Sequence, residues 1–514
     1  MPARKASSKS RTSDSSAKAP AKKSTSSRAT GNRSAKRETS KKKSSKKRTL
    51  AGSAVATNVA FAPGIFIVNM IPKSRSGEAE QDSEPFLDVN PNNTKQMVGS
   101  AFTPDPNGGP NAPVFVSIDG GVTWALKSIV PSNSQTGDIT GAYSGTSNKF
   151  YSGILKRPGN LLLNILGTND PTAMTVMTIR SSRSNIDQPY TQAVTVTGKE
   201  RVYVGNNDFS APGGKTATVD LSLNAGAASA PFSSTRIEKR GTGSAGQDGP
   251  QIRPVCHADG TVYASFYGWR AFSNTNQVTA DVVVVRDDNG AAGANPFASL
   301  IDPSDGLAGM RVAKGVKFVW DDTMGNQRLG GDISIAVDPN NSRTVYLAWA
   351  DVRTTTGYTL HVRRSTDGGK TWSSSDLRTI ARAKNPGLAI NTNGKVGFLY
   401  QKVTGSGASQ RWVTQIDRAT DGVNFTSSLV LANVPANDPP VQFQPFIGDY
   451  LRLLAVGKDF YGIFSAGNTP DAANFPSGIT YQRNADFAAR RLLANNGTSV
   501  VRPSIDPFFF KITE

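Results

Sequence analysis

The chain has 514 residues, of which 58 are Lys or Arg and 39 are Asp or Glu, so its formal net charge is +19. A single cysteine excludes an intrachain disulfide, and two histidines, His257 and His361, exclude a histidine-rich metal site. No run approaches the roughly 20 apolar residues that a membrane-spanning helix needs.

The first 50 residues are expected to form a disordered basic tail. Residues 1–49 contain 17 Lys or Arg against Asp14 and Glu38, a balance of +15, and they contain no aromatic residue. Such a segment has too little apolar surface to offset the entropy cost of ordering it. Its charge would attract a polyanion, such as nucleic acid, an anionic membrane or an acidic cell-wall polymer, or would only keep the chain in solution.

Residues 51–83 are expected to be a linker. Three basic residues at 46–48 precede the segment AGSAVATNVAFA, which resembles a weak export signal interrupted by polar residues. The sequence therefore leaves the location of the protein open, with bacterial secretion or display at the cell surface as one alternative. Within the linker, residues 64–68 read as a strand that would complete the ring of the following domain or extend its rim.

Residues 84–514 contain a repeated Asn-rich turn. Val89-Asn90-Pro91-Asn92-Asn93 recurs with one conservative change at 337–341, and each copy lies between two apolar strands. Looser copies occur at 258–260, 390–394 and 456–459. Asn, Asp, Pro and Gly favour tight turns, so these segments are expected to join the first and second strands of successive units.

A second repeated turn follows the pattern S-x-D-G-G-x-T-W. It occurs at 117–124 and 365–372, and a worn copy at 419–425 ends in Phe. The Asp can accept backbone N–H bonds within a hairpin, the glycines supply positive φ, and the aromatic residue can pack under the turn. The residues that carry this pattern are Asp119, Trp124, Asp367, Trp372 and Asp421.

This pattern resembles the Asp-box (BNR) repeat of the sialidase-like propellers. The resemblance implies that the Asp-box residues are structural and lie on the face away from the active site. Units that start near residues 84, 138, 197, 249, 331, 386 and 446 predict an all-β propeller of seven four-stranded blades, with six as the alternative. Residues 487–497 are the best candidate for a short helix.

The face opposite the Asp boxes is expected to hold any ligand, because it receives the loops that enter first strands and leave second strands. Arginine can pair bidentately with an acidic sugar, and a carboxylate can act as a general acid. The candidate catalytic residues are Asp332, Asp449 and Tyr450, and the candidate substrate-binding residues are Arg253, Arg270, Arg353 and Trp269. The alternative is that these charges pair with one another and that the aromatic residues belong to the core.

The leading hypothesis is a glycan-directed propeller that binds or hydrolyses acidic or complex carbohydrate, as a sialidase-like glycoside hydrolase if it is an enzyme. The Arg-Ile-Pro motif expected early in a sialidase is missing, and the nearest match is Gln251-Ile252-Arg253-Pro254. The alternative is a non-enzymatic interaction scaffold whose basic tail binds a polyanion such as nucleic acid. Neither hypothesis requires a metal or cofactor, and the sequence does not determine the oligomeric state.

Overall fold

The computed structural model divides the chain into two units, Met1–Ser53 and Ala54–Glu514. It describes residues only in the second unit, so the expected disordered tail lies outside the described residues. Among the described residues, no helix has the length and apolar character needed to cross a membrane. The described residues are 58–104, 112–130, 136–156, 162–168, 178–228, 230–241, 252–273, 277–319, 322–323, 328–329, 332–354, 357–439 and 447–514.

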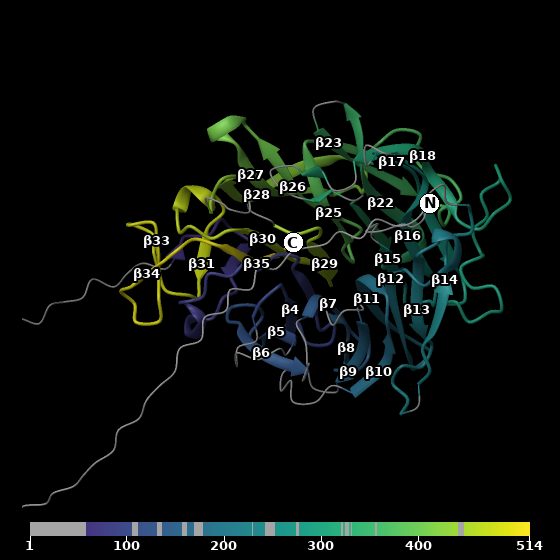
Figure 1. Ribbon diagram of the computed structural model, residues 1–514, viewed down its shortest axis with the longest axis horizontal. Coiled ribbons are helices and arrows are strands. Elements are labelled where there is room, and N and C mark those ends of the chain that lie inside the picture. Colours follow the sequence, from purple (N-terminus) through teal and green to yellow (C-terminus); the bar gives the residue numbers. More distant parts are fainter. Residues whose placement is uncertain are drawn as a thin grey trace, which may run out of the picture. The chain divides into compact units, whose positions relative to one another are not determined.

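The second unit is a β-propeller (Figure 1). The described residues form seven sheets of four or more strands, and neighbouring strands in the first four positions are antiparallel. The sheet that closes the ring has β29 as its first strand. The first strands are β3 (Phe86–Val89), β7 (Thr136–Tyr143), β11 (Ile186–Val196), β15 (Arg253–Cys256), β21 (Ile333–Asp338), β25 (Ala383–Ile390) and β29 (Arg452–Val456). The second strands are β4 (Met97–Ser100), β8 (Phe150–Lys156), β12 (Lys199–Asp208), β16 (Val262–Phe272), β22 (Asn341–Thr354), β26 (Val396–Thr404) and β30 (Asp459–Gly467).

The outer strands complete each sheet in the same antiparallel order. The third strands are β5 (Ala112–Ser117), β9 (Leu162–Thr168), β13 (Ala217–Ser222), β17 (Gln277–Asp287), β23 (Gly357–Ser365), β27 (Arg411–Ala419) and β35 (Ile505–Ile512). The fourth strands are β6 (Ala125–Val130), β10 (Thr178–Arg183), β14 (Ser233–Arg236), β18 (Met310–Val319), β24 (Arg378–Ala381), β28 (Phe425–Pro435) and β2 (Ile65–Asn69).

Smaller elements lie in the connections between strands. Two short strands, β31 (Ile479–Tyr481) and β1 (Asn58–Val59), extend the closing sheet beyond β2. The remaining strands are β19 (Asp322–Thr323), β20 (Arg328–Leu329), β32 (Ala485–Asp486), β33 (Arg491–Leu493) and β34 (Val500–Val501). The short 3-10 helices are η1 (Lys73–Arg75), η2 (Pro212–Gly214), η3 (Gly407–Ser409) and η4 (Ala472–Asn474).

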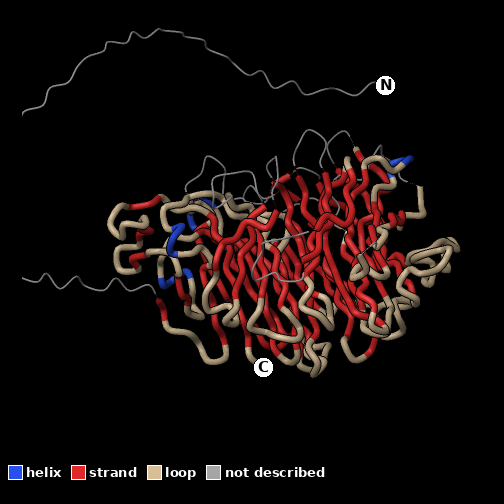
Figure 2. The backbone as a smooth tube through the Cα atoms, turned by 90° about the horizontal axis from the view of Figure 1, so that it is seen from below, coloured by secondary structure: helices blue, strands red, loops and turns tan. Residues whose placement is uncertain are grey.

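The first strands form a closed ring. Each contacts the first strand of the next sheet, from β3 through β7, β11, β15, β21 and β25 to β29, and β29 contacts β3 again. Figure 2 shows the strands of the sheets standing side by side. A closed ring leaves no first strand without a neighbour on either side, and its centre is lined by the residues that these strands present.

The hydrophobic core consists of side chains that pack between the faces of neighbouring sheets. Each hydrophobic cluster of the described residues draws on at least two neighbouring sheets. For example, Leu163 of β9 packs with Val204 of β12, and Val68 of β2 packs with Leu87 of β3. Because both faces of every sheet are covered in this way, long apolar strands such as β17 can be buried along most of their length.

The sheet that closes the ring joins the two ends of the described chain. Its order is β1-β31-β2-β35-β30-β29, so β2 from residue 65 onward is antiparallel to β35 near the C-terminus. Phe508, Phe509 and Phe510 of β35 are buried in this sheet. The strand expected at 64–68 is therefore the fourth strand, counted from β29, of the sheet that closes the ring.

Two sequence expectations were wrong. The third unit begins at Ile186 and not near residue 197, because Thr197-Gly198 forms the turn after its first strand. That strand contains Pro189 and a run of polar residues, so it does not read as an apolar strand. Residues 487–497 form turns and the strand β33 instead of a helix, because packing of Leu492 into the closing sheet outweighs local helix propensity.

Candidate functional site

The turns at 117–124, 365–372 and 419–425 are called Asp-box turns below after the pattern that they resemble. Those at 117–124 and 365–372 lie on the same face of the ring as the turns after the first strands. Gly120 N donates to Lys95 O at 3.0 Å, and Gly368 N donates to Arg343 O at 2.8 Å. In both sheets the Asp box connects the third and fourth strands, whereas the accepting carbonyl precedes or begins the second strand. The first strands therefore begin on the opposite face, where the candidate ligand residues were expected.

The two complete Asp boxes form the same hydrogen bonds. Asp119 Oδ1 accepts from Thr123 N at 2.9 Å and Oδ2 accepts from Thr123 Oγ1 at 2.6 Å. Asp367 accepts from Thr371 N at 3.0 Å and from its hydroxyl at 2.6 Å. Partial burial raises the pKa of Asp367, but the bonds from Thr371 and Ser365 outweigh it and lower the pKa to about 2. The ionised Asp367 carboxylate therefore stabilises the hairpin by accepting hydrogen bonds within its own turn.

The aromatic residues of the boxes pack under the turns. Trp124 Nε1 donates to Gly121 O at 3.0 Å, and Trp372 Nε1 donates to Gly369 O at 3.1 Å. In the worn copy, Asp421 accepts instead from Val423 N and Asn424 N, at 2.9 and 2.7 Å. The Asn424 side chain replaces the threonine hydroxyl there, so a different residue completes the same kind of turn.

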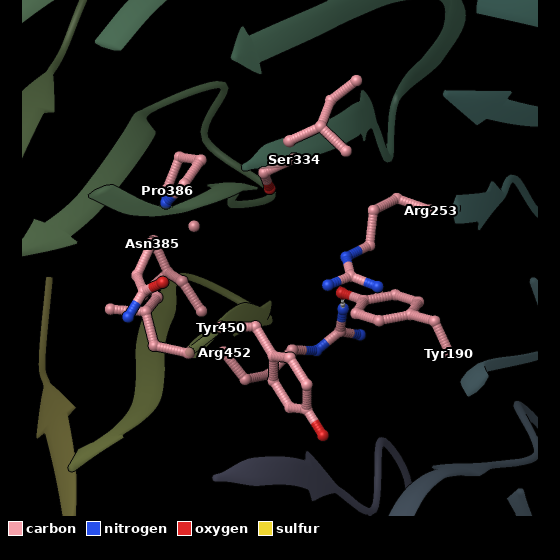
Figure 3. A pocket seen from close by; sticks show the side chains of 11 residues that line it. Tyr190, Arg253, Ser334, Asn385, Pro386, Tyr450 and Arg452 are labelled. Carbon is pink, nitrogen blue, oxygen red and sulfur yellow. Dashed lines mark hydrogen bonds between the residues drawn. The ribbon is translucent and has the colours of Figure 1, made fainter. Parts of the chain in front are cut away.

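A pocket with about 280 Å³ of space lies at the centre of the ring, on the face where the first strands begin (Figure 3). Residues from five first strands, or immediately before them, line it. We call it the axial pocket; its polar lining residues are Tyr190, Arg253, Ser334, Asn385, Tyr450 and Arg452.

Two arginines converge on one tyrosine in this pocket. The guanidinium carbons of Arg253 and Arg452 lie 4.3 and 5.0 Å from the centre of the Tyr190 ring. Arg452 Nη1 also donates to the Tyr190 hydroxyl. Burial lowers the pKa of each arginine to about 10, so both stay charged at neutral pH. The pocket therefore has a positive wall.

The Arg253 guanidinium packs against two tyrosine rings and is stabilised by the charges of nearby carboxylates. Its side chain is buried, its guanidinium also lies 5.4 Å from the Tyr450 ring centre, and its Nη2 has no hydrogen-bond partner among the described residues. The charges of Asp138, Asp332 and Asp449 raise its pKa against the larger effect of burial. These carboxylates stabilise the cation without occupying its hydrogen-bonding edge.

The Tyr450 side chain forms a hydrogen bond to a sheet that is not adjacent to its own. Its hydroxyl donates to Asp138 Oδ1 of β7 at 2.9 Å, although β3 separates β7 from β29 in the ring. Burial, with the charges of Asp138 and Glu84, raises the pKa of Tyr450 well above its usual range. Tyr450 is therefore a neutral phenol that closes one side of the pocket.

The two candidate acids lie beside the pocket. Asp332 precedes β21, is buried, and accepts from Asn385 N at 2.8 Å through Oδ2. Burial raises the pKa of Asp332, the nearby Asp449 raises it further, and Lys384 and Arg253 oppose the shift. Asp449 is also buried and precedes Tyr450 in the chain. The structure thus brings together Arg253, Asp332, Asp449 and Tyr450 from the sequence-based set.

The other candidates lie elsewhere. Arg270 donates from Nε to Asp281 at 2.8 Å and from Nη1 to Glu238 at 3.1 Å, so protein carboxylates pair with two of its three nitrogens, and its buried Nη2 has no partner among the described residues. It does not line the axial pocket. Trp269 is buried in the core between two sheets and stacks on Phe272 at 5.6 Å. The side chain of Arg353 lies outside the described residues.

Several polar pocket residues were missed or undervalued in the sequence, among them Arg452, Tyr190 and Asn385. Arg452 occupies the first position of β29, as Arg253 does in β15, so aligning the first strands would have paired them. Tyr190 was missed because the third unit was started too late. Asn385 precedes a proline and reads as a loop residue, but it lies within β25 with a positive φ of 53°.

Among the described residues, one cluster of three carboxylates has the spacing of a metal site. Oxygen atoms of Glu78, Asp82 and Asp506 lie within 4.8 Å of one another. Arg483 Nη1, which is fully buried, lies 2.9 Å from both Glu78 and Asp506. The arginine is therefore the cation of this cluster, which ties residues near the start of the ring to its last strand.

No family model and no curated protein matches the chain. Solved structures with a similar arrangement include a Penicillium chrysogenum alpha-L-arabinanase complexed with arabinobiose (10% identity, 88% of this chain and 98% of that chain, TM-score 0.40). Others are the Hadza microbial sialidase Hz136 (12%, 72% and 70%, TM-score 0.36) and Chaetomium thermophilum Sqt1 bound to the N-terminus of ribosomal protein L10 (9%, 85% and 100%, TM-score 0.38).

Proposed function

We propose that the chain binds a carboxylated carbohydrate in the axial pocket. The observation that carries this proposal is the Arg253 guanidinium, which is 3% exposed and presents Nη2 without a hydrogen-bond partner among the described residues. Leaving a buried cationic donor unpaired costs free energy, and a carboxylate recovers it by accepting two parallel N–H bonds. An anionic ligand is therefore the natural partner of this edge.

Arg452 strengthens the positive wall and fixes its shape. Its bond to the Tyr190 hydroxyl holds the ring on which Arg253 lies, so the two arginines and the tyrosine keep one geometry. Ser334 accepts from Leu388 N at 3.0 Å, which leaves its hydroxyl proton available to a ligand oxygen. A pocket with a charged end and separate polar groups suits a polyhydroxy acid better than a simple anion.

For a hydrolytic activity on such a ligand, Asp332 is the proposed general acid. Its raised pKa favours the protonated form that a general acid needs. Asp449 is the proposed second carboxylate, and Tyr450 positions the floor of the pocket through Asp138. Asp332→Asn should preserve binding and lower turnover, because the shape is kept and the transferable proton is lost.

The proposal is tested by screening the purified protein on a glycan array and with a fluorogenic sialoside, followed by calorimetric titration with D-glucuronate and N-acetylneuraminate. Arg253→Lys should weaken the affinity for the acid that binds by about tenfold or more, roughly 1.4 kcal/mol, because a lysine keeps the charge and loses the planar fork.

Arg343→Lys is the matched control, since Arg343 is exposed on the Asp-box face. It should leave the affinity unchanged. The proposal fails if no acidic carbohydrate binds the folded wild type, or if Arg253→Lys retains full affinity while it unfolds at the wild-type temperature.

A further inference from the structure

The wall of the axial pocket opposite Arg253 is formed in part by Asn385. Figure 3 shows its amide oxygen on the side that faces the pocket, with Arg253 on the far side. Asn385 is 1% exposed, and its Oδ1 has no hydrogen-bond partner among the described residues. The pocket thus offers a buried donor at one wall and a buried acceptor at the other.

The orientation of the Asn385 amide follows from two main-chain carbonyls. Gln401 Nε2 donates to Ser465 O at 3.0 Å, and a carbonyl only accepts, so Gln401 Oε1 must face Asn385. Asn385 Nδ2 donates to Gln401 Oε1 at 2.9 Å and to Gly448 O at 3.1 Å. Turning the Asn385 amide would place its oxygen against both acceptors, so Oδ1 is fixed towards the pocket.

The backbone of Asn385 is fixed as well. Its N–H donates to Asp332 at 2.8 Å, and its φ of 53° lies in the left-handed region that asparagine tolerates better than most residues. A residue held in this conformation by side-chain and main-chain bonds keeps its acceptor in place before any ligand arrives. Backbone strain of this kind concentrates at ligand sites.

We infer that Asn385 is a specificity-determining residue that accepts a hydrogen bond from a ligand hydroxyl, so that the pocket selects a hydroxylated ring carboxylate, a uronic acid, over a plain carboxylate. This inference rests on the proposed function, in which Arg253 binds the carboxylate. A buried donor at one wall and a buried acceptor at the other match a sugar residue that carries both a carboxylate and a hydroxyl group.

The test compares D-glucuronate with cyclohexanecarboxylate, which keeps the six-membered ring and the carboxylate but has no hydroxyl group. Calorimetric titration of the full chain should show that D-glucuronate binds at least about tenfold more tightly, since a plain ring leaves the buried Asn385 oxygen unsatisfied. Asn385→Gly suits the positive φ and removes the acceptor. It should lose this preference and retain its affinity for cyclohexanecarboxylate.

The comparison of the two acids on the wild type needs no substitution, so it keeps the test decisive where Asn385→Gly does not fold. Equal binding of the two acids to the wild type overturns the role of Asn385 and leaves Arg253 as the carboxylate site. An unchanged preference for D-glucuronate in folded Asn385→Gly also overturns the role of Asn385 and leaves Arg253 as the carboxylate site. Binding of neither acid to the wild type overturns both proposals together.

Discussion

At the scale of single residues, the structure decides the charge state of a buried histidine. His361 is fully buried, its Nδ1 lies 2.8 Å from Asp376 and its Nε2 lies 3.0 Å from Asp351. Both neighbours are acceptors when they are ionised, so each ring nitrogen must carry a proton. Burial lowers the pKa of His361, but the hydrogen bonds and charges of the two carboxylates outweigh it and raise the pKa.

We therefore expect His361 to stabilise the fold most at low pH. A folded-state pKa above the unfolded value of about 6.5 gives stability that is complete below that pH and is lost as the pH rises through the folded value. The difference in free energy of unfolding between wild type and His361→Gln should shrink as the pH is raised from about 6. Denaturant unfolding across that range measures it.

The same substitution at the other histidine, His257→Gln, controls for the general effect of pH on the protein. Nε2 of His257 lies 3.1 Å from the carbonyl oxygen of Pro339, and its Nδ1 lies 2.9 Å from the Asp259 carboxylate, so it faces one carboxylate and is not enclosed by two. A difference for His361→Gln that stays constant or grows with pH would contradict the charged state.

At the scale of elements, the Asp-box hairpins show which contacts are local. The boxes at 117–124 and 365–372 repeat the same side-chain bonds although they belong to different sheets. Ser117 Oγ donates to Asp119 at 2.8 Å and accepts from Gly121 N at 2.9 Å, and the second box has the same pair. Eight residues are thus enough to specify the turn, whereas the partner of Trp124, Phe509 at 5.3 Å, comes from the far end of the chain.

Asp367→Ala should lower the free energy of unfolding by about 1–3 kcal/mol, because the turn loses several hydrogen bonds to one carboxylate. Asp119→Ala should act in the same way. Lys370→Ala is the control, since Lys370 is exposed in the same turn. Thermal unfolding and ligand titration should show reduced stability with unchanged affinity of the folded fraction; a loss of affinity at full stability would falsify the structural role.

At the scale of the whole molecule, the ring is closed by segments from both ends of the described chain. β2 pairs with β35 over five residue pairs, and Arg483 bonds to Glu78, 405 positions away in the sequence. The basic tail ends before β1 begins at Asn58, so none of these contacts requires residues 1–49.

Deleting residues 1–49 should leave the thermal unfolding of the propeller unchanged and remove salt-sensitive binding to DNA or to a heparin-like polymer. The tail carries +15, and polyanion binding driven by counterion release weakens steeply with salt. Deleting residues 1–69, which also removes β2, should instead destabilise the fold because β35 loses its outer partner. Equal polymer binding before and after the shorter deletion would place the polyanion site on the propeller.

The sequence by itself determined the local features of this protein. Turn residues at fixed offsets, such as Asp119 and Asp367, specify their hairpins through bonds within eight residues, and their spacing along the chain predicts an all-β propeller. The order of the strands alone predicted that the Asp-box turns and the turns after the first strands share one face of the ring. The strand at Ile186–Val196 was not predicted, because its residues are mostly polar and no turn of the repeated Asn-rich kind follows it.

Only the tertiary structure decided which side chains meet at the centre of the ring. Arg253, Asn385 and Arg452 belong to three different sheets and meet in the axial pocket, whereas Arg270, near the end of the second strand β16, pairs with Glu238 and Asp281 outside it. Contacts in the axial pocket join residues as far apart as Tyr190 and Arg452, 262 positions along the chain. They exist because closing the ring brings the starts of the first strands together, and that closure depends on packing between sheets rather than on any single segment.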